Sequence, residues 1–189
     1  MIINSSGVNY DTDTMRTDEE INALIKSGLN GYLKKELISQ IAISKTVSGK
    51  TSDSVSTILP YTELKDAVGV IFEFKGTLKV TFSSSSSYGN IYFTVGGYNS
   101  SPTFARVYGN STNSKTYTLN RSIPFWALLY YEQYGGFYKT FTAMNTSSGT
   151  HCFTVDSFDE NTVYFRIENT NYVTSTVVNG TIDVYALKI

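Results

Sequence analysis

Few residues of this chain have the type and spacing of a reactive centre. Residues 44–51 (SKTVSGKT) nearly match the phosphate-binding pattern G-x-x-x-x-G-K-[ST], with serine in place of the first glycine. That pattern binds phosphate only where a buried strand precedes it and a helix follows it. The stretch that follows here, TSDSVSTILP, is a poor helix former. We therefore interpret residues 44–51 as part of a polar linker and expect no nucleotide.

The only histidine, His151, is adjacent to the only cysteine, Cys152. On a strand, adjacent side chains point to opposite faces, so the two cannot form a catalytic dyad, which needs a hydrogen bond between them. No G-x-S-x-G sequence is present for a serine nucleophile. One histidine and one cysteine also cannot supply the usual zinc ligands. The sequence thus predicts no catalytic residue, no metal and no cofactor, and a buried apolar role for Cys152.

Carboxylates could instead form the acid and base pair of a glycoside hydrolase. The candidates on or beside predicted strands are Glu73, Glu132, Asp156, Asp159, Glu160 and Glu168. Their spacing selects no two of them. The cluster at 156–161 (DSFDEN) lacks the regular alternation of a calcium-binding loop, so we interpret it as a solvated turn. We expect the protein not to be an enzyme.

Aromatic residues are the remaining candidates, with 15 Tyr, 11 Phe and 1 Trp in the chain. Exposed Tyr and Trp rings stack on sugar C–H faces, while Asn, Asp and Ser groups hydrogen-bond to hydroxyls. Packing is the competing role for any single ring. The predicted ligand-binding residues are Trp126, Tyr98, Tyr131 and Tyr134 for stacking, and Asp156 and Asn161 for hydroxyl groups.

The first part of the chain has a helical pattern. Thr17 is a good N-cap residue, and Glu20 follows at the capping-box spacing. Apolar residues then recur at helical intervals, which predicts a helix near 18–27 and a second near 32–38. This stripe is too short for a self-sufficient coiled coil. We therefore predict an attachment segment over residues 1–43 and a polar linker over 44–59.

From Pro60 onward the pattern changes to short alternating β segments. Val70, Phe72 and Phe74 would share one face, and Gly76 and Asn179-Gly180 indicate turns. The predicted strands are 70–75, 78–82, 90–95, 104–108, 115–119, 125–132, 137–143, 151–155, 162–167 and 173–188. With no helix between them, they indicate an antiparallel β-sandwich over residues 60–189. The predicted fold class is mainly β with a short N-terminal helical segment.

Composition restricts the partners. The net charge is -1, charged residues are only 16%, and Ser, Thr and Asn make up 61 of the 189 residues. This balance argues against nucleic acid and anionic lipid, and no apolar run is long enough for membrane insertion. The longest such run, 125–131 (FWALLYY), is apolar on both faces, which predicts a central strand covered on its second face. A sister subunit is one natural cover, so we expect a homo-oligomer, most simply a homotrimer.

The chain places GVNYDTDTMRTDEEINALI before a Ser/Thr/Tyr-rich β-domain that ends in GTIDVYALKI. This layout resembles bacteriophage virion proteins, especially tail-fibre or baseplate receptor-binding proteins with a C-terminal jelly-roll head. The resemblance implies a virion location, attachment to other virion proteins through residues 1–43, and a non-catalytic trimeric head that binds host-surface saccharide or protein. A long coiled-coil shaft is missing. The alternative is therefore a capsid head-fibre or decoration protein with a purely structural role.

Overall fold

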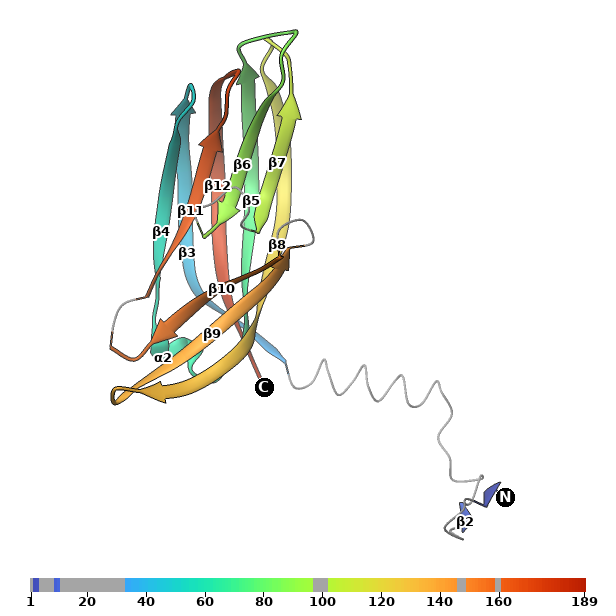
Figure 1. Ribbon diagram of the computed structural model, residues 1–189, viewed down its shortest axis with the longest axis vertical. Coiled ribbons are helices and arrows are strands. Elements are labelled where there is room, and N and C mark those ends of the chain that lie inside the picture. Colours follow the sequence, from blue (N-terminus) through green and yellow to red (C-terminus); the bar gives the residue numbers. More distant parts are fainter. Residues whose placement is uncertain (1, 4–8, 11–32, 97–101, 146–148, 159–160) are drawn as a thin grey trace. The chain divides into compact units, whose positions relative to one another are not determined.

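The computed structural model describes residues 2–3, 9–10, 33–96, 102–145, 149–158 and 161–189 (Figure 1). The chain divides into two compact units, Met1–Lys34 and Lys35–Ile189. In the first unit, the short strands β1 (Ile2–Ile3) and β2 (Asn9–Tyr10) pair in antiparallel fashion. The helix predicted near 18–27 lies outside the described residues.

The second unit is a β-sandwich, as predicted, made of two antiparallel sheets. The order of the first sheet is β10 (Gly149–Asp156), β9 (Gly136–Asn145), β8 (Lys115–Gln133), β5 (Ala67–Phe82), β12 (Val173–Lys188) and β3 (Lys34–Ser48). The order of the second is β4 (Ser52–Leu59), β11 (Asn161–Asn169), β6 (Gly89–Val95) and β7 (Thr103–Gly109). The described residues contain one helix, α2 (Tyr61–Leu64), and none that could cross a membrane.

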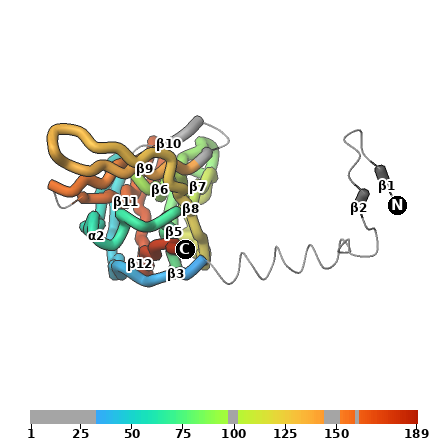
Figure 2. Tube along the Cα trace, turned by 90° about the horizontal axis from the view of Figure 1, so that it is seen from below, coloured from blue at the N-terminus to red at the C-terminus, as the bar shows by residue number. Residues whose placement is uncertain are grey.

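The connectivity of these strands is that of a jelly roll. When β9 and β10 are set aside, eight strands remain, and numbered along the chain they have the orders 1-8-3-6 and 2-7-4-5 in the two sheets. This is the arrangement of two Greek keys in a double sheet. The hairpin of β9 and β10 is inserted between the sixth and seventh strands and extends the first sheet. Seen from below (Figure 2), it lies on the opposite side of the sandwich from β3.

The hydrophobic core lies between the two sheets, and aromatic rings fill its centre. Val70, Phe72 and Phe74 are fully buried on one face of β5, as the alternation predicts. The ring of Phe72 packs edge-on against Phe125 of the same sheet and Phe165 of the other, with both centroids 5.5 Å away. Such edge-to-face pairs stabilise a core beyond the area they bury. Alternating apolar residues therefore define the inner faces of both sheets.

The turns predicted at Gly76 and at Asn179-Gly180 are wrong. Both glycines lie inside long strands, and they are direct partners across β5 and β12. A Cβ atom on Gly76 would lie 2.2 Å from the Asn179 carbonyl oxygen and 2.8 Å from the Phe74 ring. Glycine occupies both positions because the two backbones approach closely beneath the Phe74 ring, and not because the chain turns there.

The second helix predicted at 32–38 and the linker predicted at 44–59 are also wrong. From Lys34 the chain forms β3, and β4 pairs with β11 along its whole length. Half-buried strands need an apolar residue only at alternate positions, and here Ser and Thr occupy the others. Ile43 and Val47 of β3 are buried in the core. Two strands of the sandwich thus precede residue 60, and residues 44–51 contribute to β3 and its turn into β4.

Candidate functional site

The apolar run 125–131 does not form the central strand that the sequence predicts. The first half of β8 pairs with β5 as far as Trp126, and the second half pairs with β9. The register shifts between Ala127 and Leu129, so Leu128 forms a β-bulge, which bends a strand. Beyond this bulge β8 turns aside together with β9 and β10 (Figure 1). We call residues 126–145 and 149–156 the arm.

One surface of the arm, its outer face, carries paired side chains, because directly opposite residues on neighbouring strands share a face. The pairing places three rows on this face: Trp126, Thr142 and Cys152; Leu129, Thr140 and Thr154; and Tyr131, Tyr138 and Asp156. The first and last rows are four residues apart along β9, or about 13 Å. Trp126 is 49% exposed. Cys152 is also exposed, so its predicted burial is wrong.

The last row carries an aromatic cluster formed by Tyr131, Tyr138 and Phe158. The two tyrosine rings stack at 5.1 Å between centroids, with 11° between their planes. Phe158 meets Tyr138 edge-on at 6.4 Å. Phe158 also covers Gly136 so closely that a Cβ atom there would lie within 1.9 Å of the ring. Between this cluster and Trp126, the hydroxyls of Thr140 and Thr154 hydrogen-bond at 2.8 Å.

The tip of the arm is a two-residue turn formed by Tyr134 and Gly135. Both residues have a positive φ, 54° and 77°, and Gln133 pairs with Gly136 across the turn. Hairpin turns of this kind favour Asn-Gly, and a tyrosine in the left-handed region costs about 1 kcal/mol. Tyr134 is 88% exposed, so packing does not compensate for this cost. Stability alone therefore does not explain a tyrosine at this position.

Asp156 and Asn161 close the connection from β10 to β11. The Asn161 amide accepts a hydrogen bond from the Asp156 N–H at 3.0 Å and donates one to its carbonyl at 3.1 Å. The Asp156 carboxylate accepts a hydrogen bond from the Phe158 N–H at 2.9 Å. These bonds position Phe158 in the aromatic cluster. Direct binding of hydroxyl groups by Asp156 and Asn161 stays a prediction.

The structure brings four of the six predicted residues onto the arm. Trp126, Tyr131 and Asp156 share the outer face, and Tyr134 forms the tip. Asn161 begins β11, beside the arm, and Tyr98 lies outside the described residues. Leu129 and Phe158 also belong to this surface, and the sequence did not predict them as binding residues. A turn centred on Tyr134-Gly135 would have placed Tyr138 opposite Tyr131, because the turn sets the hairpin register.

The inner face of the arm is anchored to the sandwich near α2. Tyr130 stacks on Phe137 at 6.0 Å, and its hydroxyl lies 3.3 Å from that of Tyr61. Burial and this hydrogen bond raise the pKa of Tyr61 to about 12. The Lys139 ammonium donates a hydrogen bond to the carbonyl of Lys65 at 2.7 Å, and burial lowers the pKa of Lys139. These contacts fix the arm against α2 and the chain that follows it.

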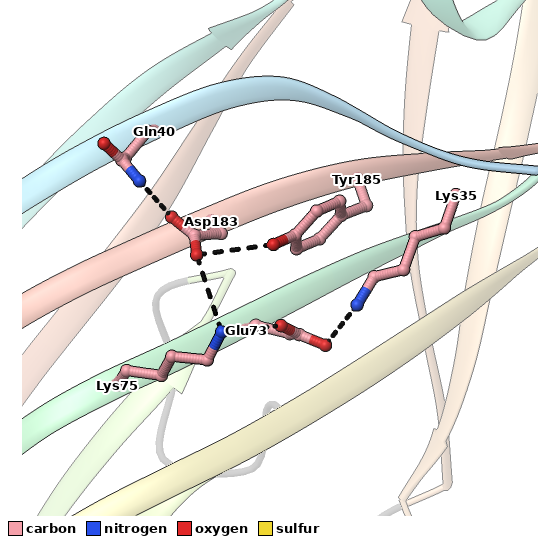
Figure 3. A network of polar contacts seen from close by, with 6 residues as sticks. All are labelled: Lys35, Gln40, Glu73, Lys75, Asp183 and Tyr185. Carbon is pink, nitrogen blue, oxygen red and sulfur yellow. Dashed lines mark hydrogen bonds and ion pairs between the residues drawn. The ribbon is translucent and has the colours of Figure 1, made fainter.

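A separate polar network lies on the outer face of the first sheet (Figure 3). Glu73 and Asp183 are direct partners across β5 and β12. Lys35 hydrogen-bonds to Glu73, and the Lys75 ammonium lies 3.4 Å from Glu73 and 3.8 Å from Asp183. Gln40 of β3 donates a hydrogen bond to Asp183 at 2.7 Å. The network therefore joins β3, β12 and β5.

The charged neighbours of Glu73 determine the direction in which its pKa is shifted, and so whether it suits acid catalysis. The hydrogen bond from Lys35 lowers the pKa of Glu73, against the opposing effect of burial, and Lys75 lowers it further. A general acid of a glycoside hydrolase needs the opposite, a carboxyl pKa raised towards neutrality. The geometry of Glu73 is thus that of a structural ion pair.

We expect the Glu73→Gln variant to lose about 1 kcal/mol of stability at neutral pH, because Lys35 and Lys75 lose a charged partner. Since the native pKa is lowered, this contribution is present above the unfolded pKa, near 4.3, and disappears as the pH falls through the native value. Urea denaturation at pH 7 and at about pH 2.5 measures both limits. The two proteins should differ at neutral pH and converge in acid. A constant difference would contradict this account.

Comparisons with known proteins are limited to fold likeness. No protein-family model and no curated protein matches the chain. A chain from the structure of infectious bursal disease virus, Gx strain, is 12% identical, and the match covers 82% of this chain and 31% of that one, with a TM-score of 0.30. A chain of the native virion of Kashmir bee virus is 12% identical. That match covers 95% of this chain and 82% of that one, with a TM-score of 0.25. The third is a family 11 carbohydrate-binding module from Clostridium thermocellum, in complex with a mixed-linked tetrasaccharide. It is 15% identical, and the match covers 84% of this chain and 91% of the module, with a TM-score of 0.21. The chain spans about a third of the length of the first of these proteins.

Proposed function

We propose that this protein is a non-catalytic attachment protein of a virion, and that its arm binds neutral saccharide on a host surface. The outer face of the arm carries this proposal. Its aromatic cluster and Trp126 lie about 13 Å apart along β9, with threonine hydroxyls between them. Rings separated by hydroxyls suit a short chain of sugars, since the rings stack on C–H faces and the hydroxyls exchange hydrogen bonds.

The jelly roll supports a virion role in general terms, because this fold serves both in viral capsids and in lectins. Recognition of hydroxyl groups exchanges bonds to water for bonds to protein, so each site would bind weakly. A trimer of chains on one particle would supply avidity. In this proposal, residues 1–33 join the chain to other virion proteins. The attachment segment is shorter than the predicted 1–43, because β3 begins at Lys34.

The Tyr134→Asn variant separates binding from stability. We expect it to weaken binding to an array of neutral surface oligosaccharides at least fivefold, because the exposed ring is lost. Its melting temperature should stay the same or rise, since asparagine tolerates a positive φ better than tyrosine does. Trp126→Ala should weaken binding to a similar extent.

Tyr172→Asn is the matched control for this experiment. Tyr172 also has a positive φ, 64°, and an exposed ring. It precedes Val173, which pairs with Phe82 at the far end of β5 from the arm. This variant should bind like the unmodified protein. Equal binding by Tyr134→Asn and Tyr172→Asn would exclude the tip of the arm from the saccharide site.

A purely structural role is the second candidate, and the arm also provides its support. Leu128 is 65% exposed and Leu129 is 53% exposed. Leucine cannot hydrogen-bond to sugar hydroxyls, and contiguous exposed apolar residues mark contacts between proteins. Light scattering of a Leu128→Asp, Leu129→Asp variant separates the two roles. A subunit interface on the arm would make this variant dissociate, whereas a saccharide site would leave its mass unchanged.

A further inference from the structure

A groove of about 630 Å³ lies between the two sheets, at the edge formed by β7 and β8. β7 is the last strand of the second sheet. The first half of β8 pairs with β5 on one side, and β9 joins the other side only from Trp126 onward. Two strand edges therefore border this groove. It is lined by Thr103, Phe104, Ala105, Arg106, Val107, Tyr108, Tyr117, Leu119, Arg121 and Ser122.

The groove is positively charged. Arg106 and Arg121 line it, and its lining contains no acidic residue. The Lys115 ammonium lies 5.2 Å above the centre of the Tyr117 ring, which adds a third positive charge beside the groove. Glu73 is the register partner of Ser122, but its carboxylate is held by the lysines of the outer network. In a chain of net charge -1, this is a local concentration of cations that attracts anions.

The position of Arg121 is not explained by packing. It belongs to the alternate residues of β8 that face the core, between Leu119 and the buried Ile123, and it is the register partner of the buried Phe74. An apolar residue would extend the core at this position. In the part of the chain that the structure describes, no carboxylate lies within ion-pair distance of Arg121 or Arg106. The Arg106 guanidinium lies 5.2 Å from the centre of the Tyr92 ring, its register partner on β6. Arg121 is therefore the guanidinium group that is available to an anionic ligand.

We propose that this groove binds a saccharide that bears a carboxylate, such as a uronic acid residue. A guanidinium group binds a carboxylate through two parallel hydrogen bonds, which gives direction as well as affinity. The exposed ring of Tyr108 lines the groove and stacks on Tyr88 at 4.7 Å, so it offers a flat, supported surface to a sugar ring. The volume lies within the range of small-ligand sites, about 300–1,000 Å³. This site is separate from the arm and does not depend on it.

An extended acidic peptide is the competing ligand, because free strand edges can bind an added strand. The edge of β7 is poorly suited to this. Its register with β6 shifts between Phe93 and Thr94, so that Phe104 is an extra residue that interrupts the regular ladder. A bulged edge opposes continuous strand addition. The groove thus favours a compact sugar over an added strand.

The test uses trigalacturonic acid and its methyl ester as probes, with binding to the full chain measured by calorimetry at low salt. We expect the acid to bind and the Arg121→Gln variant to bind it at least tenfold more weakly. Arg121→Lys should be intermediate, because it keeps the charge and loses the paired hydrogen bonds. The methyl ester should bind both proteins equally weakly. Trp126→Ala should bind the acid normally, which separates this site from the arm.

Lys79→Gln is the charge-matched control. Lys79 lies between the buried Leu78 and Val80 and is exposed on the opposite face of the sheet. The Lys79→Gln variant should bind the acid as tightly as the unmodified protein does. The proposal is overturned if Lys79→Gln and Arg121→Gln weaken binding equally, because net charge alone would then explain it. It is also overturned if the acid does not bind at millimolar concentration, or if an acidic peptide binds in an Arg121-dependent way while the acid does not.

Discussion

Replacing Gly76 by alanine should lower the free energy of unfolding by about 4 kcal/mol, at the upper end of single substitutions. The added Cβ atom would lie 2.2 Å from the Asn179 carbonyl oxygen and 2.7 Å from the Gly180 Cα atom. Both are backbone atoms in the paired strand, so no side-chain rotation relieves the clash. The two central strands would have to separate, and the buried ring of Phe74 would have to move.

Gly135→Ala is the control for this prediction. Gly135 has a φ of 77°, and a Cβ atom there would meet nothing within 4 Å. Only the left-handed conformation would be penalised, by about 1 kcal/mol. Urea denaturation followed by circular dichroism compares the two variants. Similar stabilities would show that the strands of β5 and β12 do not approach as closely as described.

A chain that begins at residue 33 should fold cooperatively, whereas one that begins at Pro60 should not. The shorter chain lacks β3 and β4, which form one edge of each sheet. The hydrogen bonds of the buried Asn169 show why the loss of β3 would destabilise the sandwich. Its amide donates a hydrogen bond to the Val47 carbonyl of β3 at 2.9 Å and accepts one from Thr176 of β12 at 2.7 Å. Without β3, that amide would lose a buried partner.

Thermal unfolding and binding of a hydrophobic dye distinguish these two chains. The chain from residue 33 should melt in one transition and bind little dye. The chain from Pro60 should melt without a clear transition and bind dye strongly, since core residues of both sheets would be exposed. The same sharp melting temperature for both would mean that β3 and β4 contribute nothing to the sandwich.

The sequence predicts the sandwich well where apolar residues alternate with polar ones. Val70, Phe72 and Phe74 show this alternation, and all three are buried. β4 and the second half of β3 were predicted as a linker because Ser and Thr fill the exposed positions of residues 44–48 and 52–56, and the same composition is typical of linkers. Gly76 and Gly180 were predicted to form turns because glycine is common in turns. The close approach of the β5 and β12 backbones, which requires glycine here, cannot be read from the sequence.

The candidate site illustrates a different limit. Trp126 and Tyr131 are five positions apart, an odd number, so a regular strand would place them on opposite faces. They share the outer face because the bulge at Leu128 adds one residue to β8. Residue types alone indicated aromatic chemistry in this stretch. The local irregularity that gathers those rings on one surface has no clear signature in the sequence.

The pairing of β8 also determines how the arm would transmit a mechanical load. Within the first sheet, β9 and β10 are joined to β5 through β8, whose other half pairs with β5 from Gly69–Trp126 to Val80–Lys115. A pull on the tip directed along the first half of β8 would act parallel to both strands of this ladder, so its hydrogen bonds would resist together. A pull across the strands would instead open them one at a time. The joint between the arm and the sandwich should therefore resist tension along the first half of β8 far better than force from the side.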